Sequence, residues 1–183
     1  MKKYNEFINE NIRDILKGKS DEDVKKGLEG LSDSDKIKQI IKYQLDYDLL
    51  PEILVVNGNL YCSYNKLTIL PDNLTVNGDL NCSNNELTSL PENLTVNGDL
   101  YCYSNQLTIL PENLVVNGNL YCNNNKLTSL PDNLVVNGNL ICFYNQLTSL
   151  PENLVVDGYL SCRNNPLSKD TKKPKGVKGD LIL

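Results

Sequence analysis

Residues 110–129 read LPENLVVNGNLYCNNNKLTS, and copies of this 20-residue unit fill the chain from 50 to 167 without an insertion. Ile53 and Asp157 are the two exceptions, because each replaces an Asn that the other copies carry. The constant positions of the unit are represented in its first copy by Pro51, Leu54, Val56, Gly58, Leu60, Cys62, Asn65 and Leu67. A fixed period of this length predicts a repeat solenoid in which each unit forms one coil.

The segment L-x-C-x-x-N-x-L resembles the consensus of leucine-rich repeats, and the whole unit is most similar to the short bacterial type. The resemblance covers about two thirds of the chain. It implies a short strand that buries two side chains, followed by an Asn whose side chain bonds the backbone of the neighbouring coil. We therefore expect a leucine-rich-repeat-like solenoid of six coils with a parallel β-sheet, stabilised by stacking because a single coil cannot fold alone.

The sequence Val116-Asn-Gly-Asn-Leu120 offers an alternative, because Asn-Gly between short apolar runs also forms two-residue hairpin turns. A string of hairpins would not require the fixed Asn and Leu that follow each Asn-Gly, so the solenoid is the stronger interpretation. In the solenoid, we expect Gly58 and its copies to form a corner with positive φ. Pro51 and its copies would begin the opposite side of the coil, where no backbone donor is needed.

The segments outside the repeats are expected to cover the ends of the solenoid, which would otherwise expose its core. Residues 1–19 have apolar residues at helical spacing and form either an amphipathic helix or a targeting leader. Residues 20–50 are predicted to form an α-helical cap, with capping boxes that begin at Ser20 and Ser32. Residues 51–167 are the six-repeat solenoid.

Residues 168–183 contain five Lys and two Asp, interrupted by Pro174, Gly176 and Gly179. This composition is typical of a solvated loop or flexible tail. Because the repeats carry a net charge of −7 (three basic and ten acidic residues), we expect the basic tail to fold back on them. The apolar end, 180–183, is expected to lie as a short strand over the sixth repeat.

The acidic repeat surface argues against nucleic acid as a partner, since a phosphate-binding groove needs Lys and Arg along its face. No run approaches the roughly 20 apolar residues of a membrane span, and no secretory signal is visible, so we expect no membrane contact. All six Cys share one phase of the repeat and are expected to point inward. Buried free thiols are favoured over disulfides, because in-register parallel side chains give a poor dihedral angle.

The residues that alternate with the buried Leu60 and Cys62 must point outward and form a concave stripe. Seven of the ten Tyr lie in the repeats, all at these variable positions or in the adjacent column. A surface rich in Tyr and Asn with few charges favours protein recognition, although both residue types also suit an exposed sheet. The predicted partner-binding residues are Tyr61, Asn81, Tyr101, Tyr103, Tyr121, Ile141, Phe143 and Tyr159.

Catalysis is not expected, because the chain lacks His and its recurring carboxylates after Pro follow a solvated edge rather than converging. No cofactor is implied, and no metal site, because neither C-x-x-C nor His spacing occurs. The sequence thus predicts a non-catalytic, monomeric protein-binding module. A structural or assembly solenoid without a specific target is the alternative, and a concentration-independent monomer in size-exclusion chromatography would count against self-assembly.

Residues 1–10, MKKYNEFINE, resemble the capsid-targeting leaders of internal proteins of T-even and related phages. Those leaders carry an aromatic residue, then Glu-Phe-Ile, and end in an Ile-x-Glu site for the prohead protease. The resemblance implies cleavage between Glu10 and Asn11, packaging in the phage head and delivery to a host cell. The expected location is then the virion interior followed by the host cytoplasm, and otherwise the bacterial cytoplasm.

Overall fold

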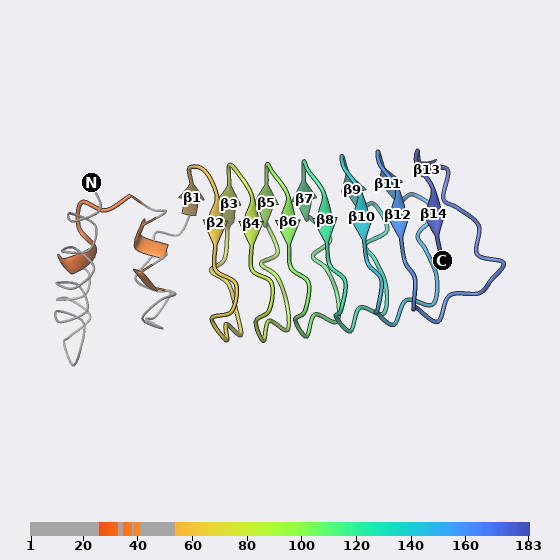
Figure 1. Cartoon of the computed structure of the whole chain (residues 1–183). Helices are drawn as coiled ribbons and strands as arrows, with labels where there is room; N and C mark the ends of the chain where they lie inside the picture. The colour runs from red at the N-terminus through yellow and green to blue at the C-terminus, as the bar shows by residue number, and fades with distance from the viewer. Residues whose placement is uncertain (1–25, 33–34, 38, 41–53) are drawn as a thin grey trace. The chain divides into compact units, whose positions relative to one another are not determined.

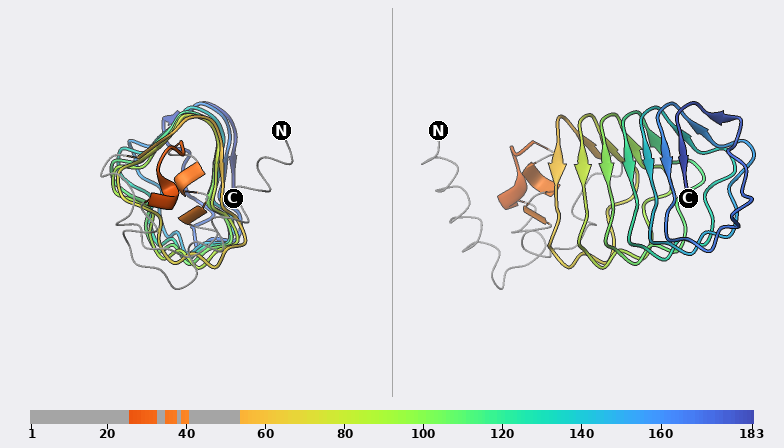
Figure 2. Two further views of the ribbon diagram at one scale, coloured as in Figure 1. Left: turned by 90° about the vertical axis from the view of Figure 1, so that its left-hand side faces the viewer. Right: turned by 45° about the vertical axis from the view of Figure 1, so that its right-hand side comes forward.

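The computed structural model describes residues 26–32, 35–37, 39–40 and 54–183. The chain divides into two compact units, Met1–Pro51 and Glu52–Leu183. Figure 1 shows the second unit as a stack of similar coils, each with two short strands. Viewed along the stack, the coils superpose closely on one another (Figure 2). The prediction of a leucine-rich-repeat-like solenoid with parallel pairing is therefore confirmed.

The strands form two parallel seven-stranded sheets, where the sequence predicts one. The first sheet contains β1 (Leu54–Val56), β3 (Leu74–Val76), β5 (Thr95–Val96), β7 (Val115–Val116), β9 (Val135–Val136), β11 (Val155–Val156) and β13 (Gly176–Val177). The second sheet contains β2 (Leu60–Tyr61), β4 (Leu80–Asn81), β6 (Leu100–Tyr101), β8 (Leu120–Tyr121), β10 (Leu140–Ile141), β12 (Leu160–Ser161) and β14 (Leu181–Ile182).

The Asn-Gly segment of each unit joins a strand of the first sheet to a strand of the second. Val116 of β7 pairs with Val136 of β9, and Leu120 of β8 pairs with Leu140 of β10. Both strands thus bond to the next coil, twenty residues away, rather than to each other. The hairpin alternative is wrong for this reason, although it located the two short strands of each coil.

The core consists of the repeating apolar positions, which lie inside the stack. In the second coil these are Leu70, Leu74, Val76, Leu80, Cys82 and Leu87, all of which are buried. Each such side chain removed from water stabilises the fold by about 1.5 to 3 kcal/mol. The inward direction predicted for Leu60 and Cys62 and their copies is confirmed.

A column of Asn, each buried or half-buried, connects each coil to its neighbour, as the resemblance implies. The Asn105 side chain donates to the carbonyl oxygens of Cys82 (3.0 Å) and Cys102 (3.1 Å). Its Oδ1 accepts a bond from the backbone N–H of Leu87 at 3.0 Å. Asn85, Asn125, Asn145 and Asn165 repeat this pattern. These bonds satisfy backbone groups where the chain leaves the second sheet.

The corner glycines behave differently from the sequence prediction. Among the described copies only Gly58 has a positive φ, of 95°, so the prediction is wrong for the later copies. At Gly118 an added Cβ would lie 2.7 Å from the Gly98 carbonyl carbon and oxygen. The later glycines are thus required by close stacking. Positive φ, between 51° and 58°, occurs instead at Tyr64, Asn84, Ser104, Asn124, Tyr144 and Asn164.

Residues 176–182 complete a seventh coil, so this part of the C-terminal segment is not a flexible tail. Leu181 pairs with Leu160, which is an offset of 21 residues, one more than in the repeats. The expected C-terminal strand is confirmed as β14. The Lys178 Nζ lies 2.8 Å from the Asp157 carboxylate, so a basic residue of this segment does contact an acidic residue of the last repeat.

In the first unit, residues 26–28, 35–37 and 39–40 are helical. Ser32 is the N-cap that the second capping box predicts, because its Oγ accepts a bond from the Asp35 backbone N–H at 3.2 Å. The Asp35 carboxylate accepts a bond from the Ser32 hydroxyl at 2.7 Å. The remaining predictions for residues 1–25, including the first capping box and the Glu10-Asn11 site, lie outside the described residues.

Candidate functional site

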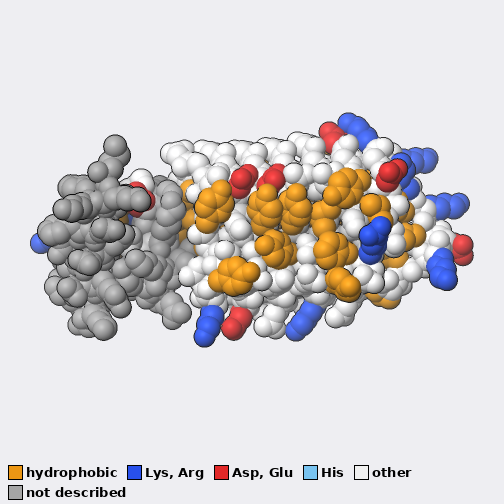
Figure 3. All heavy atoms as spheres, in the orientation of Figure 1, with side chains coloured by type: hydrophobic (Ala, Val, Ile, Leu, Met, Phe, Trp, Pro, Cys, Tyr) orange, Lys and Arg blue, Asp and Glu red, His pale blue; other side chains and the backbone are white. Residues whose placement is uncertain are grey.

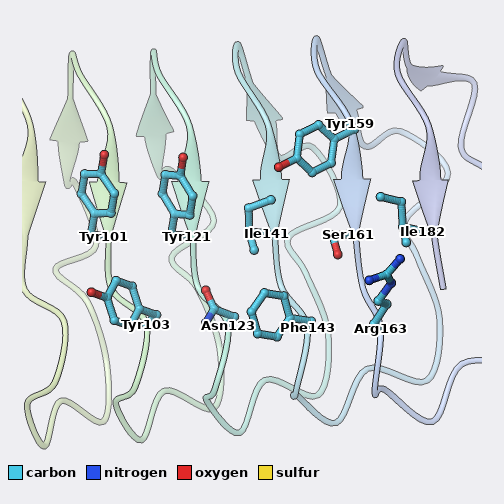
Figure 4. Close-up of a pocket in the computed structure, with 10 residues that line it drawn as sticks. All are labelled: Tyr101, Tyr103, Tyr121, Asn123, Ile141, Phe143, Tyr159, Ser161, Arg163 and Ile182. Carbon is cyan, nitrogen blue, oxygen red and sulfur yellow. The ribbon is translucent and has the colours of Figure 1, made fainter.

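The outward side chains of the second sheet line an open groove of about 620 Å³. We call this surface the tyrosine face and define it by the residues that line the groove: Tyr101, Tyr103, Tyr121, Asn123, Ile141, Phe143, Tyr159, Ser161, Arg163 and Ile182. Figure 3 shows the corresponding concentration of hydrophobic side chains across the described coils. The groove runs across the strands from β6 to β14 (Figure 4).

Six of the eight predicted partner-binding residues line this groove, and Tyr61 and Asn81 do not. Tyr61 is 60% exposed, and its hydroxyl accepts a bond from the Asn59 amide at 2.6 Å. The Asn81 Oδ1 accepts bonds from the Ser83 backbone N–H (3.2 Å) and hydroxyl (2.7 Å). The two residues point outward as predicted but lie on coils that precede the groove.

Four groove residues were not among the predicted partner-binding residues: Asn123, Ser161, Arg163 and Ile182. The first three occupy outward repeat positions, so their place in the unit could have found them. Ile182 was missed because it follows Ser161 by 21 residues and pairs with it across β12 and β14. The extra residue of the last coil hides this equivalence in the sequence.

The side chains at the bottom of the groove are nearly buried, and most of the larger side chains around them are aromatic. Ile141 and Ser161 point outward but are only 7% and 8% exposed, because larger neighbours shield them. Figure 4 shows Ile141 between Tyr121, Phe143 and Tyr159. The Tyr101 and Tyr121 rings are stacked, with centroids 4.7 Å apart and planes within 5°. The coil spacing therefore holds a pair of aromatic rings in a fixed position before any partner binds.

The column at one edge of the tyrosine face has a structural role that the sequence does not reveal. The Oδ1 atoms of Asn59, Asp79, Asp99, Asn119 and Asn139 each accept a bond from the backbone N–H of the equivalent residue in the next coil, at 2.7–2.9 Å. This chain of bonds continues to Tyr159, whose N–H is the last donor. Side-chain oxygens at these positions thus hold neighbouring coils together.

Hydrogen bonds fix the charge states at the Asp99 end of the groove. Partial burial opposes the Asp99 charge, but bonds from the Asn119 backbone and side chain and from the Tyr101 hydroxyl outweigh it and lower the Asp99 pKa. The Tyr101 hydroxyl donates to Asp99 at 3.0 Å. Desolvation, followed by this bond and the Asp99 charge, raises the Tyr101 pKa to about 12. At neutral pH Asp99 is therefore ionised and Tyr101 is a neutral donor.

The six thiols lie inside the solenoid and away from the groove, and all are free and buried. Burial raises the pKa of Cys62 and of Cys122 to about 12. These two thiols therefore stay protonated at neutral pH, whereas a bond with the Cys142 thiol lowers the pKa of Cys162. The prediction of buried free thiols is confirmed.

Within the described residues, no three His, Cys, Asp or Glu side chains converge in a way that could hold a metal ion. The same part of the chain contains no helix that is both long and apolar enough to span a membrane. An ion pair joins Lys178 and Asp157. Asp99, beside the Tyr101 end of the groove, and Arg163, near its other end, each lack an ion-pair partner among the described residues.

The first sheet presents a second, smaller hollow of about 380 Å³ around Val115 and Val135. These side chains are 43% and 47% exposed. Thr75, Thr95 and Val155 occupy the equivalent positions, so the surface hardly varies from coil to coil. β-branched residues at these positions are explained by strand formation, and the face serves below as a control surface.

No protein-family model and no curated protein sequence matches this chain. Among solved structures it is similar to YopM from Yersinia enterocolitica WA-314, with 23% sequence identity and a TM-score of 0.41. The match covers 96% of this chain and 40% of that one, so the chain spans less than half the length of this structural neighbour.

Proposed function

We propose that this chain is a non-catalytic, monomeric protein-binding module whose partner docks on the tyrosine face. The observation that carries the proposal is the open groove whose walls include the stacked Tyr101–Tyr121 pair. Tyr supplies a large contact area with few rotatable bonds, and rigid aromatic side chains dominate the binding energy of many interfaces. Stacking reduces the entropy that these two rings lose on binding.

The contrast between the constant framework and the variable face favours binding over a purely structural solenoid. The inward positions repeat the same residue types in every coil, as packing requires. The outward centre of the second sheet changes instead, from Tyr101 and Tyr121 to Ile141 and Ser161. Stacking of coils does not require this variation, whereas a groove shaped for a particular partner does.

Replacing Tyr101 and Tyr121 together with Ser tests this function. Two aromatic contacts at the centre of an interface contribute about 2 kcal/mol or more, so partner affinity should fall at least about 30-fold. The stacked pair itself contributes about 0.5 to 1.5 kcal/mol to folding, so the variant should remain folded. Affinity is measured by calorimetry against the protein that the parent chain captures from a cell extract.

The matched control is Val115→Ser with Val135→Ser, which removes the exposed apolar side chains from the first sheet. This variant should bind the partner as tightly as the parent. If it loses the partner while the tyrosine variant keeps it, the binding surface is on the first sheet. If the folded tyrosine variant binds normally, the proposal is wrong.

We also propose that the protein is packaged in a phage head and delivered to a host cell, where the solenoid binds a host protein. The support is the resemblance of residues 1–10 to capsid-targeting leaders. Protein recovered from virions should then begin at Asn11, and protein expressed alone should begin at Met1. Mass spectrometry of the N-terminal peptide decides this, and an intact Met1 in virions, or absence from virions, refutes it.

A further inference from the structure

We propose that the occupant of the tyrosine face is an extended polypeptide segment that carries a Lys or Arg at the Asp99 end of the groove, an apolar residue over Ile141, and a carboxylate at Arg163. This inference rests on the proposed function and specifies the chemistry of its partner. Three features carry it: two carboxylates beside the Tyr101 end of the groove that the fold does not require, an unpaired guanidinium in the groove, and the spacing between them.

The fold requires an oxygen, but not a charge, at Asp79 and Asp99. Each Oδ1 accepts the N–H of the next coil, and Asn59, Asn119 and Asn139 perform the same task with a neutral amide. Two carboxylates on adjacent coils also repel each other across about 4.8 Å. Asn at these positions would avoid this repulsion and keep the bond. The two charges are therefore explained by the binding of a cationic ligand.

Asp99 retains the capacity to bind such a cation. Its Oδ1 accepts bonds from the backbone and the side chain of Asn119, at 2.7 and 3.0 Å. Its Oδ2 accepts a single bond, from the Tyr101 hydroxyl, and so has a lone pair available. The adjacent Tyr101–Tyr121 pair offers aromatic rings along which the aliphatic part of a Lys or Arg can lie, with a cation–π contribution.

Arg163 supplies the opposite charge at the other end of the groove. It is exposed and occupies the repeat position that holds uncharged residues in all the earlier copies. Figure 4 shows its side chain directed toward Ile182, along the strand direction. A guanidinium presents two parallel N–H donors, which match a carboxylate.

The spacing of these groups fits an extended chain. Arg163 lies three coils beyond Asp99, about 14 Å along the stack, and four residues further along its strand, about 13 Å across the stack. The diagonal between them is about 20 Å, which an extended chain covers in about six residues. Side chains two, four and six residues after the first point the same way on an extended chain, and the fourth falls beside Ile141, the buried floor of the groove. The geometry thus favours a cation and a carboxylate six residues apart, with an apolar residue two before the carboxylate, in either chain direction.

A display library of short random peptides, selected separately on the full parent chain and on charge variants, tests this inference. On the parent chain, selected peptides should be enriched in Lys or Arg and Asp or Glu about six residues apart, with an apolar residue two before the acidic one. Asp79→Asn with Asp99→Asn keeps the structural oxygen and should remove the enrichment in cations. It should also weaken the parent's peptides about fivefold. Asp132→Asn, exposed and away from the groove, controls for the loss of negative charge.

Arg163→Glu provides a charge-reversal test at the other end. Peptides selected on this variant should carry Lys or Arg at both ends of the pattern, and peptides from the parent should bind it at least about fivefold more weakly. If selected peptides depend on Tyr101 and Tyr121 but show no charge pair, or carry it at helical spacing, this inference is wrong and the proposed binding function stands. If no selected peptide depends on the tyrosine face, both are wrong.

Discussion

Gly118→Ala is expected to destabilise the solenoid by about 3 to 5 kcal/mol, although the substitution adds a single methyl group. The new Cβ would lie 2.7 Å from the carbonyl carbon and oxygen of Gly98 and closer still to the Asp99 carboxylate. The backbone of the previous coil cannot move away without lengthening the bond between the Gly118 N–H and the Gly98 oxygen, now 3.0 Å. The Asp99 carboxylate must also move away from the new Cβ, which breaks its bonds with Asn119. Urea denaturation measures the loss.

Gly58→Ala is the matched control, because it separates the two reasons for a glycine. Gly58 has a φ of +95°, and a Cβ added there meets no atom within 4 Å. Its replacement should therefore cost only the strain of a left-handed residue, about 1 to 2 kcal/mol. A larger loss at Gly58 than at Gly118 would show that backbone conformation, and not stacking, selects glycine at this corner.

This pair of glycines shows what the sequence could and could not predict about the fold. A strict period identifies inward positions directly, since every coil must bury the same places, and so the core and the parallel register were predictable. A Gly that recurs in every coil can be required by a positive φ or by the close approach of a neighbouring coil, however, and a single sequence does not distinguish the two. The residues that do have positive φ could not be recognised, because their position in the unit holds Tyr64 and Tyr144 as well as Asn84 and Asn124.

The second sheet was missed for a related reason. The strands on either side of Asn117-Gly118 are both short and apolar, and the sequence does not say whether they pair with each other or with the next coil. At the site, the outward columns were predictable from the two-residue period of a strand. Which coils form a groove depends on side-chain size in three adjacent columns. Tyr61 and Asn81 therefore point outward without lining it.

Asn105→Ala is expected to cost about 3 to 6 kcal/mol, the largest effect among these substitutions. The side chain is 9% exposed and is bonded to the carbonyls of Cys82 and Cys102 and to the N–H of Leu87. Alanine leaves these backbone groups buried without partners, at about 1 to 3 kcal/mol each.

Asn97→Ala is the control, because it removes an exposed Asn that also bonds neighbouring coils, at 2.8 and 3.0 Å. It should cost no more than about 1 kcal/mol, because water replaces the lost partners.

Asn105→Asp tests whether the two donors of the amide, and not its shape, stabilise the coil. The carboxylate can still accept from Leu87, but it turns an oxygen toward the Cys82 and Cys102 carbonyls, where the amide donates. Burial beside these oxygens disfavours the charge and raises the folded-state pKa above the unfolded value of about 4. The penalty relative to the parent should therefore be greatest at neutral pH and shrink as the pH falls through the raised pKa. A penalty independent of pH, or equal losses for Asn105→Ala and Asn97→Ala, would contradict this role for the buried Asn column.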